Sequence, residues 1–161
     1  MNKLDACRAA IVAANSELAQ NPDRLMIWAD KGRVVTRLTT ALGYEWRYRA
    51  NILLEGLTSS PDAIMVPVLL WLREAQADLL LNFQRGDEAV KFEAHILDAN
   101  SWDLKVEFEL SEAVTLTPRD GGGWDVTHLP EPPIGDMLLE GAGATPLREI
   151  WLGGEQLIPR P

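Results

Sequence analysis

Residues 43–80 read GYEWRYRANILLEGLTSSPDAIMVPVLLWLREAQADLL, and two hydrophobic periods meet within them. Before Gly56, apolar and polar residues alternate, which is typical of a strand with one buried face. The apolar positions of this strand are Tyr44, Trp46, Tyr48, Ala50, Ile52 and Leu54. After Gly56, a Ser-Ser-Pro-Asp run predicts a helix start, and Pro67 predicts a kink or a late start. Apolar residues then recur at helical spacing at Ile64, Val68, Trp71, Leu72, Ala75 and Leu79. The segment therefore predicts a long strand joined to a helix that packs on it.

The residues before this segment predict a helix and a short hairpin. The helix runs from about Lys3 to Gln20 and ends at Asn21-Pro22, because proline disfavours the helical conformation in the residue before it. Residues 25–29 then form a strand that leads into Asp30-Lys31-Gly32-Arg33, a turn signal. Residues 34–36 are expected to return as a second strand.

A second hairpin is expected after the polar break at residues 84–87. Its apolar positions alternate on both sides of the turn at residues 98–101, at Phe92, Ala94 and Ile96 and at Trp102, Leu104, Val106, Phe108 and Leu110. The polar residues between them form the opposite face, namely Glu93, His95, Asp103, Lys105, Glu107 and Glu109. One antiparallel or mixed sheet with two helices packed on one face would bury all the apolar faces. The predicted fold class is therefore α+β.

Composition changes near Pro118. From there to Pro161 the chain holds seven of its ten prolines and eight of its twelve glycines, which disfavours a long helix or a central strand. Apolar residues such as Trp124 and Trp151 still occur in this part. We therefore expect a core domain over residues 1–117 and an extended arm over residues 118–161 that docks on its own or a neighbouring subunit.

Length, charge and cysteine content limit the classes of protein to which this chain can belong. A chain of 161 residues with 47% hydrophobic residues suits one compact domain with room for an extension. A formal net charge of −9 opposes general binding to nucleic acid or to an anionic membrane. No signal peptide or membrane span is recognised, so a cytoplasmic protein is expected. Cys7 is the single cysteine and lies on an apolar helical stripe, where a buried thiol is expected.

The motifs of common catalytic and metal sites are missing from the sequence. The Gly121-Gly122-Gly123 run lacks the Lys-Ser/Thr of a phosphate-binding loop, and His95 and His128 have no matching Cys or His pair for zinc. We therefore predict no catalytic, cofactor-binding or metal-binding residues. Two alternatives remain open at this stage: a small cytosolic enzyme whose site combines scattered carboxylates with His95, and a generic protein-binding module.

A local basic cluster lies among aromatic residues around the long strand. Its members are Lys31, Arg33, Arg37, Arg47 and Arg49. Alternation places Arg47 and Arg49 on the face opposite Tyr44, Trp46 and Tyr48, so bases could not stack on the rings and meet the guanidinium groups together. Pairing of these arginines with the acidic face of the second hairpin, within a sheet or across a subunit boundary, is the favoured interpretation.

An ordered set of short strings resembles one known family over nearly the whole chain. The strings are Asn21-Pro22-Asp23-Arg24-Leu25, Asp30-Lys31-Gly32-Arg33-Val34, Tyr44-Glu45-Trp46-Arg47-Tyr48, Asp62-Ala63-Ile64-Met65-Val66-Pro67, Trp71-Leu72-Arg73 and Leu129-Pro130-Glu131-Pro132-Pro133. In this order they resemble the tail completion protein R family of P2-like contractile-tailed bacteriophages and prophages.

The resemblance implies a non-enzymatic protein of virion assembly that acts at the head-proximal end of the tail. The implied partners are tail tube or sheath subunits and other completion or head-joining proteins, and a ring matching a six-fold tail is expected. The implied location is the virion tail, with assembly in the host cytoplasm. A closed ring needs two complementary surfaces on each subunit. Our hypothesis assigns Arg47 and Arg49 to one surface, Glu107 and Glu109 to the other, and Trp124 and Trp151 of the arm to a neighbour.

Overall fold

The computed structural model describes residues 1–36, 42–81, 86–131, 150–152 and 155–158. It divides into a first compact unit, Met1–Glu131, and a second, Pro132–Pro161. The strands are β1 Leu25–Thr36, β2 Gly43–Leu57, β3 Val90–Ile96, β4 Trp102–Pro118, β5 Trp124–His128, β6 Ile150–Leu152 and β7 Glu155–Ile158. The helices are α1 Asn2–Ala14, α2 Ser16–Gln20, α3 Asp62–Ala75 and α4 Ala77–Leu81, with short 3-10 turns at Pro22–Arg24 and Gly86–Glu88.

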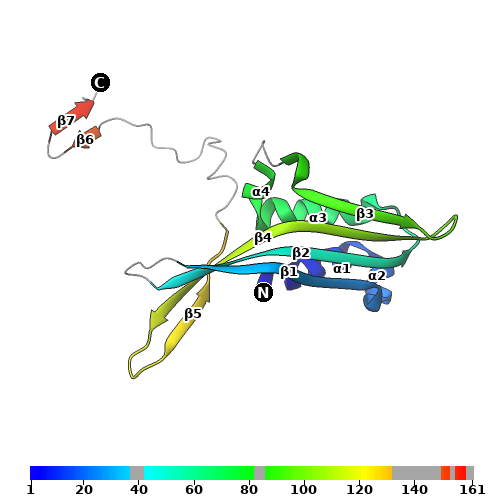
Figure 1. Cartoon of the computed structure of the whole chain (residues 1–161), viewed down its shortest axis with the longest axis horizontal. Coiled ribbons are helices and arrows are strands. Elements are labelled where there is room, and N and C mark those ends of the chain that lie inside the picture. The colour runs from blue at the N-terminus through cyan, green and yellow to red at the C-terminus, as the bar shows by residue number, and fades with distance from the viewer. Residues whose placement is uncertain (37–41, 82–85, 132–149, 153–154, 159–161) are drawn as a thin grey trace. The chain divides into compact units, whose positions relative to one another are not determined.

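The first unit is built on one antiparallel sheet with the strand order β1-β2-β4-β3, and β5 pairs with the far end of β4. The helices lie on one face of this sheet, as Figure 1 shows. The predicted α+β class, with a helical layer on one face, is confirmed. None of the helices in the described part of the chain is long and apolar enough to cross a membrane.

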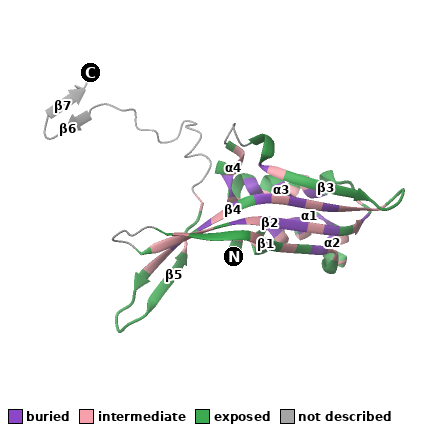
Figure 2. Cartoon of the chain, in the orientation of Figure 1, coloured by how far each residue is buried: buried purple, intermediate pink, exposed green. Residues whose placement is uncertain are grey.

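The alternating residues of β2 and β4 form the centre of the core. Ile52 lies opposite Val106, and Leu54 lies opposite Leu104, with all four side chains buried. The buried positions alternate along β4, and along β2 from Tyr48 to Leu54 except at Asn51, which is also buried (Figure 2), because successive side chains point to opposite faces of a sheet. The predicted long strand over residues 43–56 and its apolar face are therefore confirmed.

The helical layer covers this apolar face. Helix α1 buries Cys7 and Ile11, and α3 buries Ile64, Val68 and Leu72 at helical spacing. Trp71 of α3 also packs against Phe108 of β4, with ring centroids 6.2 Å apart. Pro67 lies inside α3, which begins at Asp62, so the predicted late start is wrong.

The helix expected from Lys3 to Gln20 is interrupted at Asn15. The Asn15 backbone is extended, with φ −126° and ψ 108°, so α1 ends there. Its side-chain Oδ1 accepts hydrogen bonds from the backbone N–H groups of Glu17 and Leu18, at 3.0 and 3.2 Å, and caps α2. Asparagine is a strong N-cap residue, which explains why a new helix starts at this position.

The hairpin predicted at residues 30–33 is wrong. Strand β1 continues through these residues, with Asp30 opposite Arg49 and Arg33 opposite Arg47 on β2. One extra residue on β1 is thus accommodated as a β-bulge, and Lys31 adopts a positive φ of 47° there. A positive φ and a glycine occur in bulges as well as in tight turns, so the local signal fits both.

The second predicted hairpin is confirmed. Phe92 lies opposite Val106, Ala94 opposite Leu104 and Ile96 opposite Trp102. In the turn, the Asp98 carboxylate accepts hydrogen bonds from the Asn100 backbone N–H and the Ser101 hydroxyl, both at 2.7 Å.

Strand β5 lies within residues that the sequence assigns to the arm. It follows a turn in which Gly121, Gly122 and Gly123 all have positive φ, and it pairs with the end of β4 from Val114 to Pro118. In the second unit, β6 and β7 form an antiparallel pair. The division at residues 117/118 and the docking of the arm stay predictions.

Candidate assembly surface

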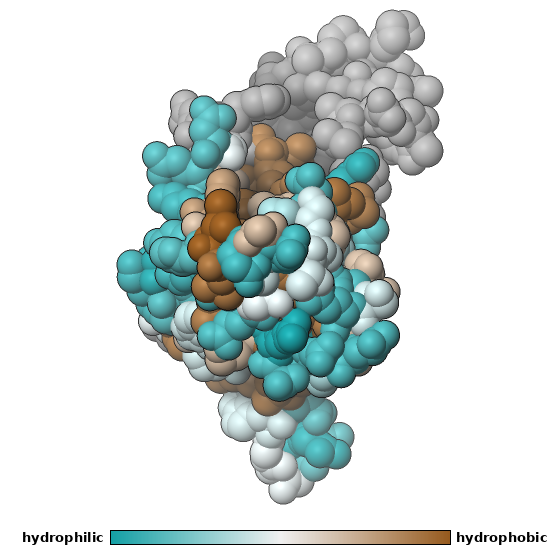
Figure 3. Space-filling model, turned by 90° about the vertical axis from the view of Figure 1, so that its right-hand side faces the viewer, coloured by the Kyte–Doolittle hydropathy of each residue, from teal (hydrophilic) through white to brown (hydrophobic). Residues whose placement is uncertain are grey.

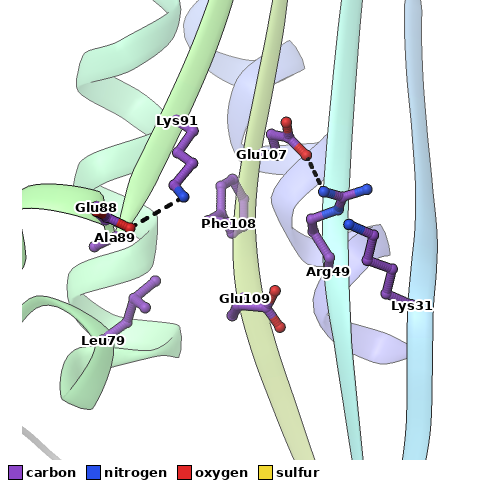
Figure 4. Close-up of a pocket in the computed structure, with 9 residues that line it drawn as sticks. All are labelled: Lys31, Arg49, Leu79, Glu88, Ala89, Lys91, Glu107, Phe108 and Glu109. Atoms are coloured by element: carbon purple, nitrogen blue, oxygen red, sulfur yellow. Dashed lines mark hydrogen bonds and ion pairs between the residues drawn. The ribbon is translucent and has the colours of Figure 1, made fainter. Parts of the chain in front are cut away.

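The face of the sheet opposite the helices carries a row of charged side chains. Directly opposed residues in neighbouring strands share a face, so the pairing of Asp30 with Arg49, and of Arg49 with Glu109, brings three charged positions together. Figure 4 looks onto this surface, with β3, β4, β2 and β1 in front and helices behind. We call it the outer face.

Arg49 is the centre of an ion-pair network on the outer face. Its Nε and NH2 atoms donate hydrogen bonds to the two carboxylate oxygens of Asp30, each at 2.8 Å, in the bidentate geometry that suits guanidinium. Its NH1 lies 2.7 Å from a carboxylate oxygen of Glu107 on the other side, and Lys105 lies 3.6 Å from the same carboxylate group. One arginine therefore links β1, β2 and β4.

The network shifts the titration of Asp30. The hydrogen bond from Arg49 lowers the pKa of Asp30 from 3.8 to about 2, because it stabilises the ionised carboxylate. Asp30 is thus fully ionised at neutral pH, and the Asp30–Arg49 pair stays charged throughout the physiological range.

Arg47 and Glu109 have more freedom than Arg49. Arg47 lies 2.7 Å from Glu45 on its own strand, and its side chain remains 45% exposed. The hydrogen bond from Arg47 lowers the pKa of Glu45. Glu109 is exposed and forms no ion pair with the residues that the structure describes. Neither side chain takes part in the ion pairs of Arg49 that the structure describes.

The four charged residues predicted for two surfaces lie on one face of a single subunit. Arg47 and Arg49 are on β2, and Glu107 and Glu109 are on the adjacent strand β4. A hollow of about 560 Å³ opens beside them, lined by Lys31, Arg49, Glu88, Lys91, Glu107 and Glu109 among others (Figure 4). The pairing of Arg49 with the acidic strand occurs within one sheet, and a role in subunit contact stays a prediction.

The remaining predicted contacts belong to different units. Trp124 begins β5 in the first unit and is 54% exposed. Trp151 lies in β6 of the second unit, and its side chain is outside the described part of the structure. Their proposed reach to a neighbour stays a prediction.

His95 of the rival enzyme hypothesis lies on exposed strand β3, opposite Asp103 of β4. It does not line the hollow beside Arg49. Among the described residues, no three His, Cys, Asp or Glu side chains are grouped so that they could hold a metal ion.

Sequence reasoning missed a buried carboxylate on the helix-covered face. Glu112 of β4 is 4% exposed and accepts hydrogen bonds from the backbone N–H groups of Asn2 and Lys3, at 3.0 and 3.4 Å, and from the Tyr48 hydroxyl. His128 Nδ1 lies 3.3 Å away, within ion-pair distance but without hydrogen-bond geometry. The sequence does contain a signal for this burial. Glu112 lies two residues after Leu110, so alternation places it on the same face as the apolar residues of the strand.

The start of α1 explains how Glu112 stays ionised in this position. Burial alone would raise its pKa, but the hydrogen bonds from Tyr48 and from the first N–H groups of α1 lower the pKa overall. Burial and the neighbouring carboxylate raise the pKa of Tyr48. Lys3 adds an ion pair to Glu131 at 2.6 Å, so the chain after β5 is fixed to the same helix end.

Comparison with known proteins gives concordant matches. The family model described as "P2 phage tail completion protein R (GpR)" matches residues 1–132. "Tail completion protein R" of Escherichia phage P2 is 35% identical over 155 residues, which cover 96% of each chain. No solved structure matches.

Proposed function

This chain belongs to the P2 phage tail completion protein R family and is a structural protein of the phage tail, and we propose that it ends tail growth at the head-proximal end. The single observation that carries this proposal is the family match over residues 1–132, which spans the entire first unit and its outer face. In this role it contacts tail tube or sheath subunits and other completion or head-joining proteins. It assembles in the host cytoplasm and remains in the virion.

The proposed mechanism is geometric and not catalytic. A protein that ends a six-fold tail must present the same contacts repeatedly, which a six-membered ring achieves. The sheet supports this role, because Arg49 on β2 connects Asp30 of β1 with Glu107 of β4 across the outer face. Specific contact with nucleic acid is not part of the proposal, since the chain carries a net charge of −9.

The outer face is the surface that we assign to contact with another protein subunit. Arg47 and Glu109 are the members with spare bonding capacity, whereas Arg49 and Glu107 hold each other in place. Charged contacts of this kind give specificity and orientation more than raw affinity. Trp124 and Trp151 are proposed as further contacts, through which residues 118–161 dock on a neighbouring subunit.

Negative-stain imaging of particles from a strain that lacks the gene tests the tail role. We expect tails of unregulated length without attached heads, and the gene supplied in trans should restore joined particles of uniform tail length. Normal infectious particles without the gene would overturn the proposal.

A further inference from the structure

The two edge strands of the sheet differ in how well they are covered. Within the described residues, β1 and β3 are the outermost strands of the β1-β2-β4-β3 order, so each has one side without a strand partner. Such edges present backbone N–H and C=O groups that can pair with another chain. Neither strand contains proline, which would block this pairing.

Strand β3 has an apolar face that the described part of the chain leaves uncovered. Phe92 is 65% exposed and Ile96 is 85% exposed, although both alternate with polar residues as in a half-buried strand. Figure 3 views the molecule from the end that carries the β3–β4 turn and shows apolar side chains gathered on the surface. A groove of about 600 Å³ runs beside Ala94 and Ile96 toward the start of α3 at Pro61.

Strand β1 at the opposite edge is covered on the corresponding face. Ile27 and Ala29 are partly buried against the core, and Arg8 of α1 donates a hydrogen bond to the Leu25 carbonyl at 2.9 Å. One edge therefore has a helical layer beneath it, whereas at the other edge no described residue covers Phe92 or Ile96 fully. A second copy placed edge to edge would bring its α1 layer toward the bare face of β3.

Strand direction supports pairing between copies that share one orientation. All neighbouring strands in the order β1-β2-β4-β3 are antiparallel, so β1 and β3 run in opposite directions. We propose that β3 of one copy pairs antiparallel with Met26–Asp30 of β1 in the next copy. The interface uses two different surfaces, so its repetition gives a ring when the rotation closes. This inference rests on the proposed function and supplies its subunit contact.

The residue pattern favours one register. The bulge at Lys31 and Gly32 stops regular pairing at one end, and Arg8 occupies the Leu25 carbonyl at the other. Between these limits, five residues of β1 can face Lys91–His95 of β3. The aligned pairs are Lys91 with Asp30, Phe92 with Ala29, Glu93 with Trp28, Ala94 with Ile27, and His95 with Met26.

This register agrees with the pleat and with side-chain size and charge. Lys91 meets Asp30 on the outer face, where opposite charges in directly facing positions are favourable. On the covered face, large Phe92 meets small Ala29, and small Ala94 meets large Ile27. A shift by one residue would place Phe92 on the charged side.

Cysteine cross-linking on assembled tails tests this pairing. Met26 and His95 are exposed and make no side-chain hydrogen bond or ion pair with the described residues, so both tolerate replacement by cysteine. In one chain they are separated by three strand spacings, about 14 Å, too far for a disulfide. The native Cys7 does not interfere, because burial raises the pKa of its thiol to about 12.

The full chain carrying both Met26→Cys and His95→Cys should give a ladder of covalent oligomers after oxidation. Each single variant should give none, and neither should the matched control Val35→Cys with His95→Cys, because Val35 lies beyond the bulge. A dimer from His95→Cys or Glu93→Cys alone would show that β3 pairs with its own counterpart and would overturn the proposal.

Immunoblotting of the same tails distinguishes a failure of the edge pairing from a failure of the proposed tail role. If the chain is present in tails and the double variant gives no ladder, the edge pairing is wrong and the tail role stands. If the chain is absent from tails, the proposed function is wrong, and the pairing falls with it.

Discussion

The two faces of β2 differ in character: one carries apolar side chains that pack in the core, and the other carries charged side chains. On the helix-covered face, Ile52 is fully buried, and its contacts stabilise the fold. On the outer face, Arg47 is half-exposed and Arg49 holds the neighbouring strands through ion pairs. Apolar burial contributes most of the free energy of folding, whereas exposed ion pairs contribute little. The difference indicates that exposed positions of the outer face, such as Arg47, can be altered at small cost to the fold.

The largest effect is expected from truncation on the helix-covered face. Ile52→Ala should lower the free energy of unfolding by about 2–5 kcal/mol, because it removes buried methylene and methyl groups and leaves a cavity. Leu53→Ala, on the outer face of the same strand, is the matched control and should cost clearly less. Urea denaturation followed by circular dichroism measures both. Equal losses would remove the distinction between the faces.

Glu112 should give the next largest effect, with a pH dependence of known sign. Its folded pKa lies below 4.5, so its stabilising contribution is complete above about pH 5 and is lost as pH falls through the folded pKa. Glu112→Gln should cost about 1–3 kcal/mol at pH 7, because buried donors lose a charged acceptor.

Denaturation measured between pH 3 and pH 7 tests this prediction. The wild-type chain should lose more stability on acidification than Glu112→Gln does, because only the wild type has this carboxylate to protonate. Parallel pH profiles for the two proteins would contradict the role assigned to Glu112.

Asp30 should give a small effect on stability and a clear effect on titration. Its pKa of about 2 depends first on the hydrogen bond from Arg49, so Arg49→Gln should raise it toward 3.8. The contribution of the pair is present above the unfolded pKa and is lost only as pH falls toward 2. Carboxyl NMR titration measures the shift. An Asp30 pKa that stays near 2 in Arg49→Gln would show that another group holds the carboxylate ionised.

Periodic patterns predicted the parts of the fold that depend on local sequence. The strand over 43–56 and the helix after Pro61 follow from residue spacing alone. The bulge at Lys31 does not follow from residue spacing, because its local signal also fits a turn. Pairing with β2 decides between a bulge and a turn. The decisive partner lies more than ten residues away in sequence.

For the candidate site, the sequence predicted which charges would pair, but it did not predict which individual residues would contact each other. Pairing of Arg49 with the acidic strand was anticipated, yet Glu109 lies opposite in register while the guanidinium contacts Glu107. The Glu112 cluster joins residues near positions 2, 48 and 128, so no local window contains it. Only the folded chain brings such groups together.

The central claim is that the outer face serves assembly and the opposite face serves folding. The most direct measurement is the fraction of tails with attached heads, counted by electron microscopy, when Arg47→Glu replaces the natural chain. We predict a large fall in this fraction with a free energy of unfolding within about 0.5 kcal/mol of wild type, because Arg47 is exposed. An unchanged fraction of joined tails, with the variant folded and present, would contradict the claim.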